Sequence, residues 1–353
     1  MTRELLLSYY RRFPCLQAED IFKFLFQSTF GCEHLVTDEA SAAEYIKREY
    51  SAVPKDSSSF TEALDGEYSR VYLSRLNEGL SPETLARLFC LSAKAEADGK
   101  EKLMEKIDIA REMVLSGEIP LDKEVFENKL LEWQGRGYPP IHHSDIFRNT
   151  YKPAYRVISD RFSDFLPVFA EIDKRLISGN VIVAIEGGSA SGKSTLSEAL
   201  SEVYDCNVFH ADDFFLRPEQ RTPERFREIG GNLDRERFYD EVIVPLTKNE
   251  AVQYRPFDCT LQTVGSAVTV APKRLTVVEG VYSMHPYFGK YYDFSVFLDI
   301  APEFQKKRIE KRNSPALAKR FFEEWIPLEH TYFQKTEIKN RIDIVIPIKE
   351  KNR

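Results

Sequence analysis

The residues best suited to chemistry in this 353-residue chain form one run, Gly187-Gly188-Ser189-Ala190-Ser191-Gly192-Lys193-Ser194-Thr195. The run has the spacing of a phosphate-binding loop. Its glycines let the backbone curl so that successive N–H groups point at the phosphates, and a following helix adds the positive end of its dipole. Lys193 is expected to reach the β- and γ-phosphates, and the Ser194 hydroxyl to hold Mg²⁺. All nine residues are therefore candidates for binding a nucleoside triphosphate.

The residues on either side of this loop support the prediction. The apolar run Val181-Ile182-Val183-Ala184-Ile185 precedes it, and an amphipathic stretch from Leu196 to Val203 follows. Strand, glycine turn and helix is the context in which such loops bind phosphate. A glycine- and serine-rich turn that binds nothing is the alternative, and this context argues against it.

A pair of carboxylates follows the next apolar segment. Asp212 and Asp213 follow the predicted strand Asn207–His210 after one residue, Ala211. Because the carboxyl ends of parallel strands share one edge, both should face the same crevice as the phosphate loop. A hydroxyl that attacks a γ-phosphate needs a carboxylate to orient it and take its proton. Asp212 is our candidate for that role and Asp213 the second candidate; solvated turn residues or helix caps are the alternative.

Two further segments could complete the site. Glu279 ends a buried run and precedes a glycine, so its carboxylate could bind Mg²⁺ beside Ser194; an ordinary turn is the alternative. Arg308 and Arg312 lie one helical turn apart in a basic stretch. Arginines on a mobile lid stabilise the charge of a transferred phosphoryl group, although a solvated helix face would have the same composition.

Together these segments resemble the uridine kinase/phosphoribulokinase family of P-loop small-molecule kinases, from about Val181 to Ile348. The matching residues are the phosphate loop, Asp212-Asp213-Phe214-Phe215, Val278-Glu279-Gly280 and the basic lid from Arg308 to Arg320. The resemblance implies that Asp212 is the catalytic base and that Ser194, Asp212 and Glu279 surround Mg²⁺. It also implies that Asp234 holds ribose hydroxyls and that Tyr254 lies near the acceptor.

Some features of the sequence differ from uridine kinases. The Asp-Asp-Phe-Phe form also resembles nicotinamide riboside kinases, so the acceptor need not be uridine. The lid lacks the Arg-Asp and Arg-Gly spacing of uridine kinases, and no histidine closely follows Tyr254 to recognise a pyrimidine.

The spacing of apolar residues divides the chain into two parts. Residues 1–162 have mostly helical spacing, which predicts a mainly helical domain, and residues 163–180 a connecting helix with Pro167 in its first turn. From residue 181 to 353, strand-like runs alternate with helical ones, which predicts a P-loop NTPase-type α/β domain, a parallel sheet with helices on both faces. The strands expected are Val181–Ile185, Asn207–His210, Leu275–Val278, Phe294–Ile300 and Ile342–Ile346.

Composition restricts the classes of partner. The formal net charge of −7 argues against a surface that binds nucleic acid or membranes in general. Five scattered cysteines without a CxxC pair favour free thiols in a reducing compartment. The first residues do not resemble a signal peptide, and the apolar segments fall short of the roughly 20 residues of a membrane span. We therefore expect a cytoplasmic protein whose partner is a small molecule, of unknown oligomeric state.

The first part of the chain matches no family that we recognise. Its unusual segments are Phe30-Gly31-Cys32-Glu33-His34 and Pro139–Asp145, the latter followed by tyrosines and arginines up to Arg156. A metal or anion site is conceivable, since histidine and carboxylate suit several divalent ions. Histidines that cap helices or bond within the fold are the more ordinary explanation, and the tyrosines and arginines could instead contact the kinase domain.

The sequence thus favours an ATP- and Mg²⁺-dependent kinase that phosphorylates a hydroxyl of a nucleoside or similar small molecule. The alternative is a nucleotide-gated sensor or regulatory ATPase whose N-terminal domain binds a ligand, and the large unassigned first half is its support. Nucleic-acid processing is disfavoured by the acidic balance and the lack of a basic, aromatic-rich patch.

Overall fold

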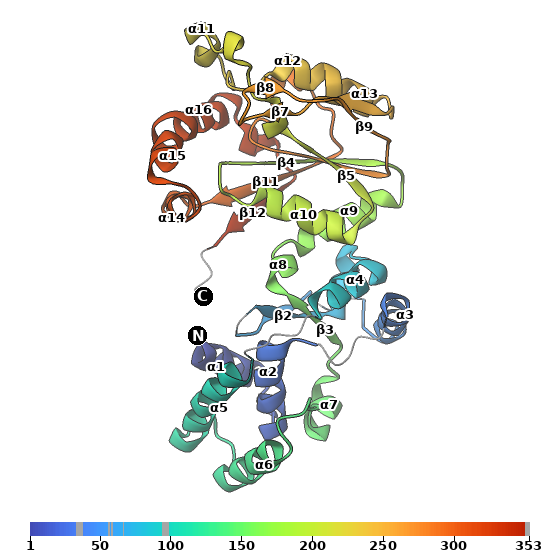
Figure 1. The fold of residues 1–353 in the computed structure, drawn as a ribbon. Helices are drawn as coiled ribbons and strands as arrows, with labels where there is room; N and C mark the ends of the chain where they lie inside the picture. Colours follow the sequence, from blue (N-terminus) through green and yellow to red (C-terminus); the bar gives the residue numbers. More distant parts are fainter. Residues whose placement is uncertain (33–37, 56, 58, 66, 94–98, 350–353) are drawn as a thin grey trace. The chain divides into compact units, whose positions relative to one another are not determined.

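The chain divides into two compact units, Met1–Leu166 and Pro167–Arg353, each described separately below (Figure 1). The computed structural model describes residues 1–32, 38–55, 57, 59–65, 67–93 and 99–349. Within that part of the chain, every helix is too short or too polar to cross a membrane. All five cysteines are free thiols, as expected from their spacing.

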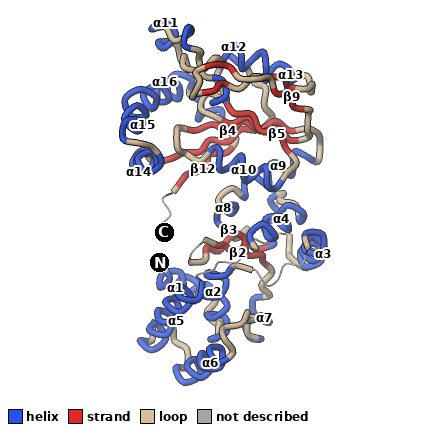
Figure 2. The backbone as a smooth tube through the Cα atoms, viewed as in Figure 1, coloured by secondary structure: helices blue, strands red, loops and turns tan. Residues whose placement is uncertain are grey.

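A five-stranded parallel sheet forms the centre of the second unit (Figure 2). Its order is β12-β11-β4-β10-β5, and every pairing is parallel. The predicted α/β class is confirmed, and all five predicted strands are present. The strands are β4 (Val181–Gly187), β5 (Cys206–His210), β10 (Leu275–Glu279), β11 (Phe294–Ile300) and β12 (Ile344–Ile348). Only β12 is displaced, since it begins two residues later than predicted.

Helices cover both faces of this sheet, with α9 and α10 along one face and α12 and α13 along the other (Figure 1). On the second of these faces, Phe238, Val242 and Ile243 pack in one buried cluster with Ala184, Phe209 and Val278 of the strands. Strands buried on both faces consist of near-continuous apolar runs, which is why their sequences were easy to find. The helices are α9 (Leu166–Leu176), α10 (Lys193–Val203), α11 (Pro223–Arg227), α12 (Arg235–Phe238), α13 (Val244–Thr247), α14 (Pro302–Arg312), α15 (Pro315–Arg320) and α16 (Ile326–Thr336).

Two short hairpins that the sequence analysis did not predict lie outside the main sheet. One pairs β6 (Val252–Tyr254) with β9 (Val268–Val270), and the other pairs β7 (Phe257–Asp258) with β8 (Thr263–Val264). Strands of two or three residues are too short to show an apolar alternation.

The first unit is mainly helical, as predicted, but it also contains a three-stranded antiparallel sheet. The sheet has the order β1-β2-β3, with β1 (Thr61–Ala63), β2 (Tyr68–Tyr72) and β3 (Tyr155–Ser159). Residues 68–71 of β2 are all buried, so the strand lacks the alternation that would reveal it. The helices are α1 (Thr2–Arg12), α2 (Ala18–Phe30), α3 (Glu39–Tyr50), α4 (Pro82–Ser92), α5 (Gly99–Ser116), α6 (Lys123–Gly135), α7 (Asp145–Tyr151) and α8 (Asp160–Ser163).

A buried carboxylate connects the end of β4 to two other segments of the second unit. Glu186 is completely buried, and its two oxygens accept hydrogen bonds from the backbone N–H groups of Gly187, Tyr282 and Met284 and from the Tyr332 hydroxyl. Burial raises the pKa of Glu186 to about 7, although these donors and Lys193 oppose the shift. Glu186 therefore fixes the start of the phosphate loop against the segment after β10 and against α16.

The raised pKa of Glu186 predicts a pH dependence of stability. An acid whose pKa is higher in the folded state stabilises it most at low pH, and this contribution is lost as pH rises toward the folded-state pKa. The ordinary pKa of a glutamate is 4.5, and that of Glu186 is about 7. As the pH rises from 4.5 to about 7, the unfolding free energy of wild type should therefore fall by about 3 kcal/mol relative to that of Glu186→Gln. Urea unfolding followed by Trp325 fluorescence in a Trp133→Phe background measures it; a difference that stays constant with pH would contradict the assignment.

Gly280 allows the end of β10 to approach the segment that carries Asp212. Its φ is +145°, and a Cβ at this position would lie 2.5 Å from Ala211 Cβ and 3.2 Å from the Ala211 backbone nitrogen. No side chain fits between these two segments without moving one of them.

Gly280→Ala is therefore expected to destabilise the second unit by at least about 2 kcal/mol, through backbone strain and overpacking. Gly179→Ala is the matched control, because a Cβ there meets nothing within 4 Å. The same fluorescence-detected urea unfolding compares both variants. Equal stability of the two would show that a side chain at position 280 fits beside Ala211 without strain.

Candidate active site

The phosphate loop has the curled backbone that the sequence predicts. Gly187 and Gly192 have φ angles of +148° and +102°, and a Cβ on Gly187 would lie 2.8 Å from the Leu298 carbonyl oxygen. No side chain caps the N-terminus of α10, which begins at Lys193. Because the first N–H groups of a helix have no intrahelical acceptor, those at the start of α10 are available to a ligand.

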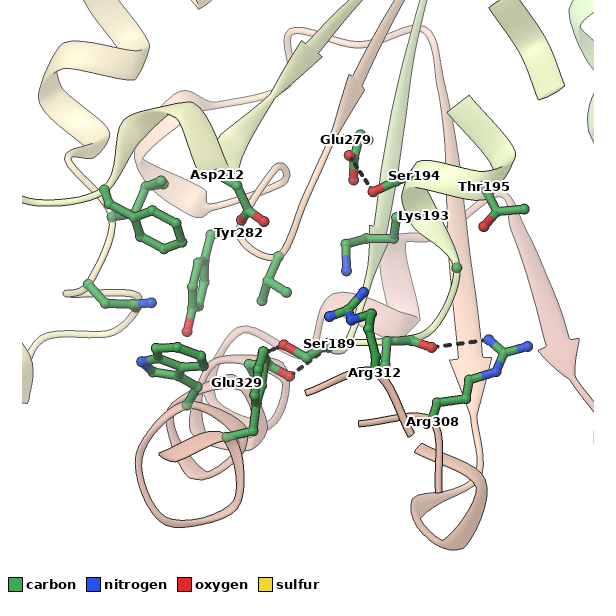
Figure 3. A pocket seen from close by; sticks show the side chains of 18 of the residues that line it. Ser189, Lys193, Ser194, Thr195, Asp212, Glu279, Tyr282, Arg308, Arg312 and Glu329 are labelled. Atoms are coloured by element: carbon green, nitrogen blue, oxygen red, sulfur yellow. Dashed lines mark hydrogen bonds between the residues drawn. The ribbon is translucent and has the colours of Figure 1, made fainter. Parts of the chain in front are cut away.

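One cavity of about 640 Å³ brings most of the predicted residues together (Figure 3). Loop residues form one wall, Asp212 and Glu279 another, and the basic helix α14 a third. The lining comprises Ser189, Ala190, Gly192, Lys193, Ser194, Thr195, Asp212, Phe215, Asn232, Leu233, Glu279, Val281, Tyr282, Arg308, Lys311, Arg312, Phe321, Trp325 and Glu329.

The predicted metal residues Ser194 and Glu279 are in direct contact. The Ser194 hydroxyl donates to Glu279 Oε1 at 3.0 Å, and His210 Nδ1 lies 2.7 Å from the same oxygen (Figure 3). Burial opposes ionisation of Glu279, but the hydrogen bond from His210 and the charge of Lys193 outweigh it and lower its pKa. The hydrogen bond to Glu279 raises the pKa of His210 in turn. Glu279 is thus a carboxylate held ready for a cation.

Asp212 lines the same cavity at the end of β5. Its side chain is exposed to the cavity, and in the described part of the chain it has no hydrogen-bond partner. Desolvation by the surrounding protein raises its pKa, while the charges of Lys193 and Arg312 oppose the shift. A carboxylate without a protein partner is free to accept a proton from a ligand.

Side chains of α14 and α16 hold the phosphate loop at three points. Gln305 Nε2 donates to the Ser189 carbonyl at 2.8 Å, and Arg308 Nη1 donates to the Ala190 carbonyl at 3.1 Å. From α16, the buried carboxylate of Glu329 accepts hydrogen bonds from the Ser189 N–H and hydroxyl. Burial raises the pKa of Glu329, although both Ser189 bonds oppose the shift.

Aromatic side chains line the part of the cavity away from the helix α10. Phe321 and Trp325 begin and end a π-helical turn between α15 and α16, and they stack edge-to-face with ring centroids 4.4 Å apart. Such turns occur frequently at functional sites. Tyr282 and Phe215 add two further rings to the lining.

Three predicted substrate residues lie outside this lining. Asp234 is buried as the N-cap of α12, with its carboxylate 3.5 Å from Arg237 Nε, and it borders a second, largely charged hollow. Tyr254 stacks on Phe214 with ring centroids 5.8 Å apart. Desolvation raises the pKa of half-buried Asp213, and the charge of His210 opposes the shift. Their contact with an acceptor stays a prediction.

Sequence reasoning missed several of the site's residues. His210 could have been predicted, because it is the last residue of the predicted strand that precedes Asp212 and so lies at the same sheet edge. No sequence pattern indicated Glu329, Trp325 or Tyr282, since their positions depend on how α16 and the turn after β10 pack around the loop.

The structure gives no support for a metal site in the first unit. Glu33 and His34 lie outside the described residues, His142 is exposed, and His143 is buried in hydrogen bonds. Throughout the described ranges, no three His, Cys, Asp or Glu side chains are placed to bind a metal by themselves. This finding does not bear on the metal site predicted at Ser194, because a serine hydroxyl and the oxygens of a bound ligand would supply some of its ligands.

Comparisons with known proteins agree with this geometry. No family model matches the chain. A uridine kinase from Chlamydia pneumoniae is 30% identical over 110 residues, which are 29% of this chain and 49% of that protein. A uridine kinase from Ligilactobacillus salivarius is 25% identical over 183 residues, 47% of this chain and 84% of that protein. The chain thus spans about half the length of the first relative.

Among solved structures, one described as a possible uridine kinase from Bacillus stearothermophilus is 22% identical, with a TM-score of 0.40. The match covers 53% of this chain and 97% of that one. On the two sequence relatives, about half of the chain is similar to the uridine kinase/phosphoribulokinase type of P-loop kinase.

Proposed function

We propose that the second unit is an ATP- and Mg²⁺-dependent kinase that phosphorylates a hydroxyl of a nucleoside or similar small molecule. The observation that carries the proposal is the shared cavity, in which the unpartnered Asp212 carboxylate lies with the phosphate loop and the Ser194–Glu279 pair. The names of the two sequence relatives point to the same chemistry.

The residues present fit a nucleotide with its metal. The uncapped start of α10 and Lys193 would hold the β- and γ-phosphates, and Arg308 and Arg312 lie on the opposite wall. Ser194 and Glu279 supply the hydroxyl and carboxylate oxygens that Mg²⁺ prefers, with Asp212 available in the same cavity. When bound, Mg-ATP supplies the phosphoryl group and neutralises part of its charge.

Each protein group then has a defined task in the transfer. Asp212 orients the acceptor hydroxyl and takes its proton, and its raised pKa makes it a better proton acceptor than an ordinary aspartate. Arg312 stabilises negative charge that develops on the transferred group. The lid contacts of Gln305 and Arg308 with the loop exclude water from the reacting atoms.

The cavity lining supports a nucleoside as the acceptor. The rings of Phe215, Tyr282 and Trp325 provide flat apolar surface on which a nucleobase can stack, and Asn232 adds an amide for its polar edge. A nucleoside combines such a base with several hydroxyls. In this proposal, Asp213, Asp234 and Tyr254 are the residues that would contact the sugar.

Asp212→Asn is expected to slow phosphoryl transfer strongly, because the amide keeps the shape of the side chain but cannot accept the proton. Acceptor-dependent ADP release over a panel of nucleosides should fall roughly 10²- to 10⁴-fold. Asp205→Asn is the control, since that carboxylate is exposed and paired only with Lys273 in the described structure. If Asp212→Asn turned over like the control, Asp212 would not be the base.

A further inference from the structure

The first unit holds a cluster of buried polar side chains that phosphoryl transfer does not use. Arg70 on β2 is completely buried, and Glu62 lies directly opposite it on β1. Tyr72 follows two residues later on the same face of β2, and Tyr155 lies opposite Tyr72 on β3. Gln27 reaches the cluster from α2. The sheet that the sequence did not reveal thus gathers these groups on one face.

A chain of hydrogen bonds runs from Asp20 through His143 to the hydroxyl of Tyr155. Asp20 is buried and accepts from the N–H groups of Gln17 and Ser144 and from the Ser144 hydroxyl. Burial opposes its ionisation, but hydrogen bonds from His143 and Ser144 outweigh it and lower the pKa of Asp20. His143 Nδ1 lies 2.7 Å from Asp20 Oδ1, and its Nε2 lies 2.7 Å from the Tyr155 hydroxyl.

These protonation states are consistent with one another. Burial lowers the pKa of His143 to about 4, so the ring is neutral at neutral pH. Since Asp20 is an acceptor, the His143 proton sits on Nδ1 and Nε2 accepts the Tyr155 proton. The Asp20–His143 pair therefore orients Tyr155, whose hydroxyl also lies 3.3 Å from Gln27 Oε1, a second and more distant acceptor for its proton.

Two of the three guanidinium nitrogens of Arg70 donate hydrogen bonds to buried acceptors. Its Nε donates to Gln27 Oε1 and its Nη1 to Glu62 Oε2, each at 2.8 Å. The rings of Tyr9, Phe24 and Tyr155 surround the guanidinium, with centroids 5.0, 5.4 and 4.9 Å from its central carbon. The guanidinium is a fixed cation with aromatic walls.

Three buried polar atoms of this cluster have no partner among the described residues, namely Arg70 Nη2, the Tyr9 hydroxyl and the Tyr72 hydroxyl. Burial raises the pKa of Tyr9, and the nearby Arg70 cation opposes the shift, although the Tyr9 hydroxyl does not meet the geometry of a hydrogen bond with it. An unsatisfied buried group costs about 1–3 kcal/mol, so three around one cation call for a bound acceptor. Tyr72 and Tyr155 are half-buried, so part of each side chain adjoins the surface, while the Tyr72 hydroxyl itself is buried.

We propose that these residues form a second ligand site, the Arg70 site (Tyr9, Glu62, Arg70, Tyr72 and Tyr155), which binds a small carboxylic acid. One carboxylate oxygen would accept hydrogen bonds from Arg70 Nη2 and from the Tyr9 and Tyr72 hydroxyls. Phosphate fits less well than a carboxylate, because a dianion meets more repulsion from Glu62 and Asp20 than a monoanion does and loses more hydration among aromatic walls.

Calorimetric titration of the full chain with acetate, pyruvate and inorganic phosphate tests this site. Wild type and the control Tyr10→Phe, a half-buried tyrosine outside the site, should bind the carboxylates and not phosphate. Tyr9→Phe and Tyr72→Phe should each weaken carboxylate binding roughly tenfold by removing one donor. The proposal is wrong if neither carboxylate binds or if the two variants bind like wild type. Equal binding of phosphate would overturn the carboxylate assignment.

A stability measurement on the same variants separates loss of binding from loss of folding. Because neither hydroxyl has a partner, Tyr9→Phe and Tyr72→Phe should unfold at the same or a higher urea concentration than wild type without ligand. Trp133 fluorescence in a Trp325→Phe background reports the first unit. A clearly lower midpoint would show that the hydroxyls are already satisfied, which would remove the reason for a ligand.

Discussion

The register of three neighbouring parallel strands determines where chemistry can occur in the second unit. Glu279 at the end of β10 lies opposite Ile185 on β4 and His210 on β5. The segments that follow these strands, with the phosphate loop and Asp212, therefore leave the sheet side by side. A shift of one strand by a single residue would turn its side chains to the other face and separate the groups. Every contact in the cavity depends on this alignment.

Around the phosphate loop, buried negative charge is balanced by a small number of donors. Glu186 at the start of the loop and Glu329, which contacts Ser189, both have raised pKa values because of burial, whereas His210 and Lys193 lower the pKa of Glu279. Glu329 holds the Ser189 N–H, a donor of the type that phosphates use in such loops. A nucleotide that enters the cavity thus meets a loop whose conformation is already fixed by carboxylates.

The sequence predicted those parts of the site that depend on local pattern. Ser194, Asp212 and Glu279 each follow an apolar strand, and parallel topology alone brings such positions to one edge. The places of Glu329 and Trp325 in the site depend on how α16 packs against the loop. Asp234 is the N-cap of α12, and no local pattern indicated that a helix begins there. The Arg70 site depends on pairing strands more than 80 residues apart in the chain, as between Tyr72 and Tyr155.

The central claim is that the second unit transfers a phosphoryl group to a small hydroxyl acceptor instead of to water. Phosphorus-31 NMR of Mg-ATP incubated with the protein and a nucleoside panel separates the two outcomes directly. We expect a new phosphomonoester signal that grows in step with ADP and only when an acceptor is present. Release of inorganic phosphate alone, whatever acceptor is added, would contradict it and identify a nucleotide-hydrolysing regulatory unit.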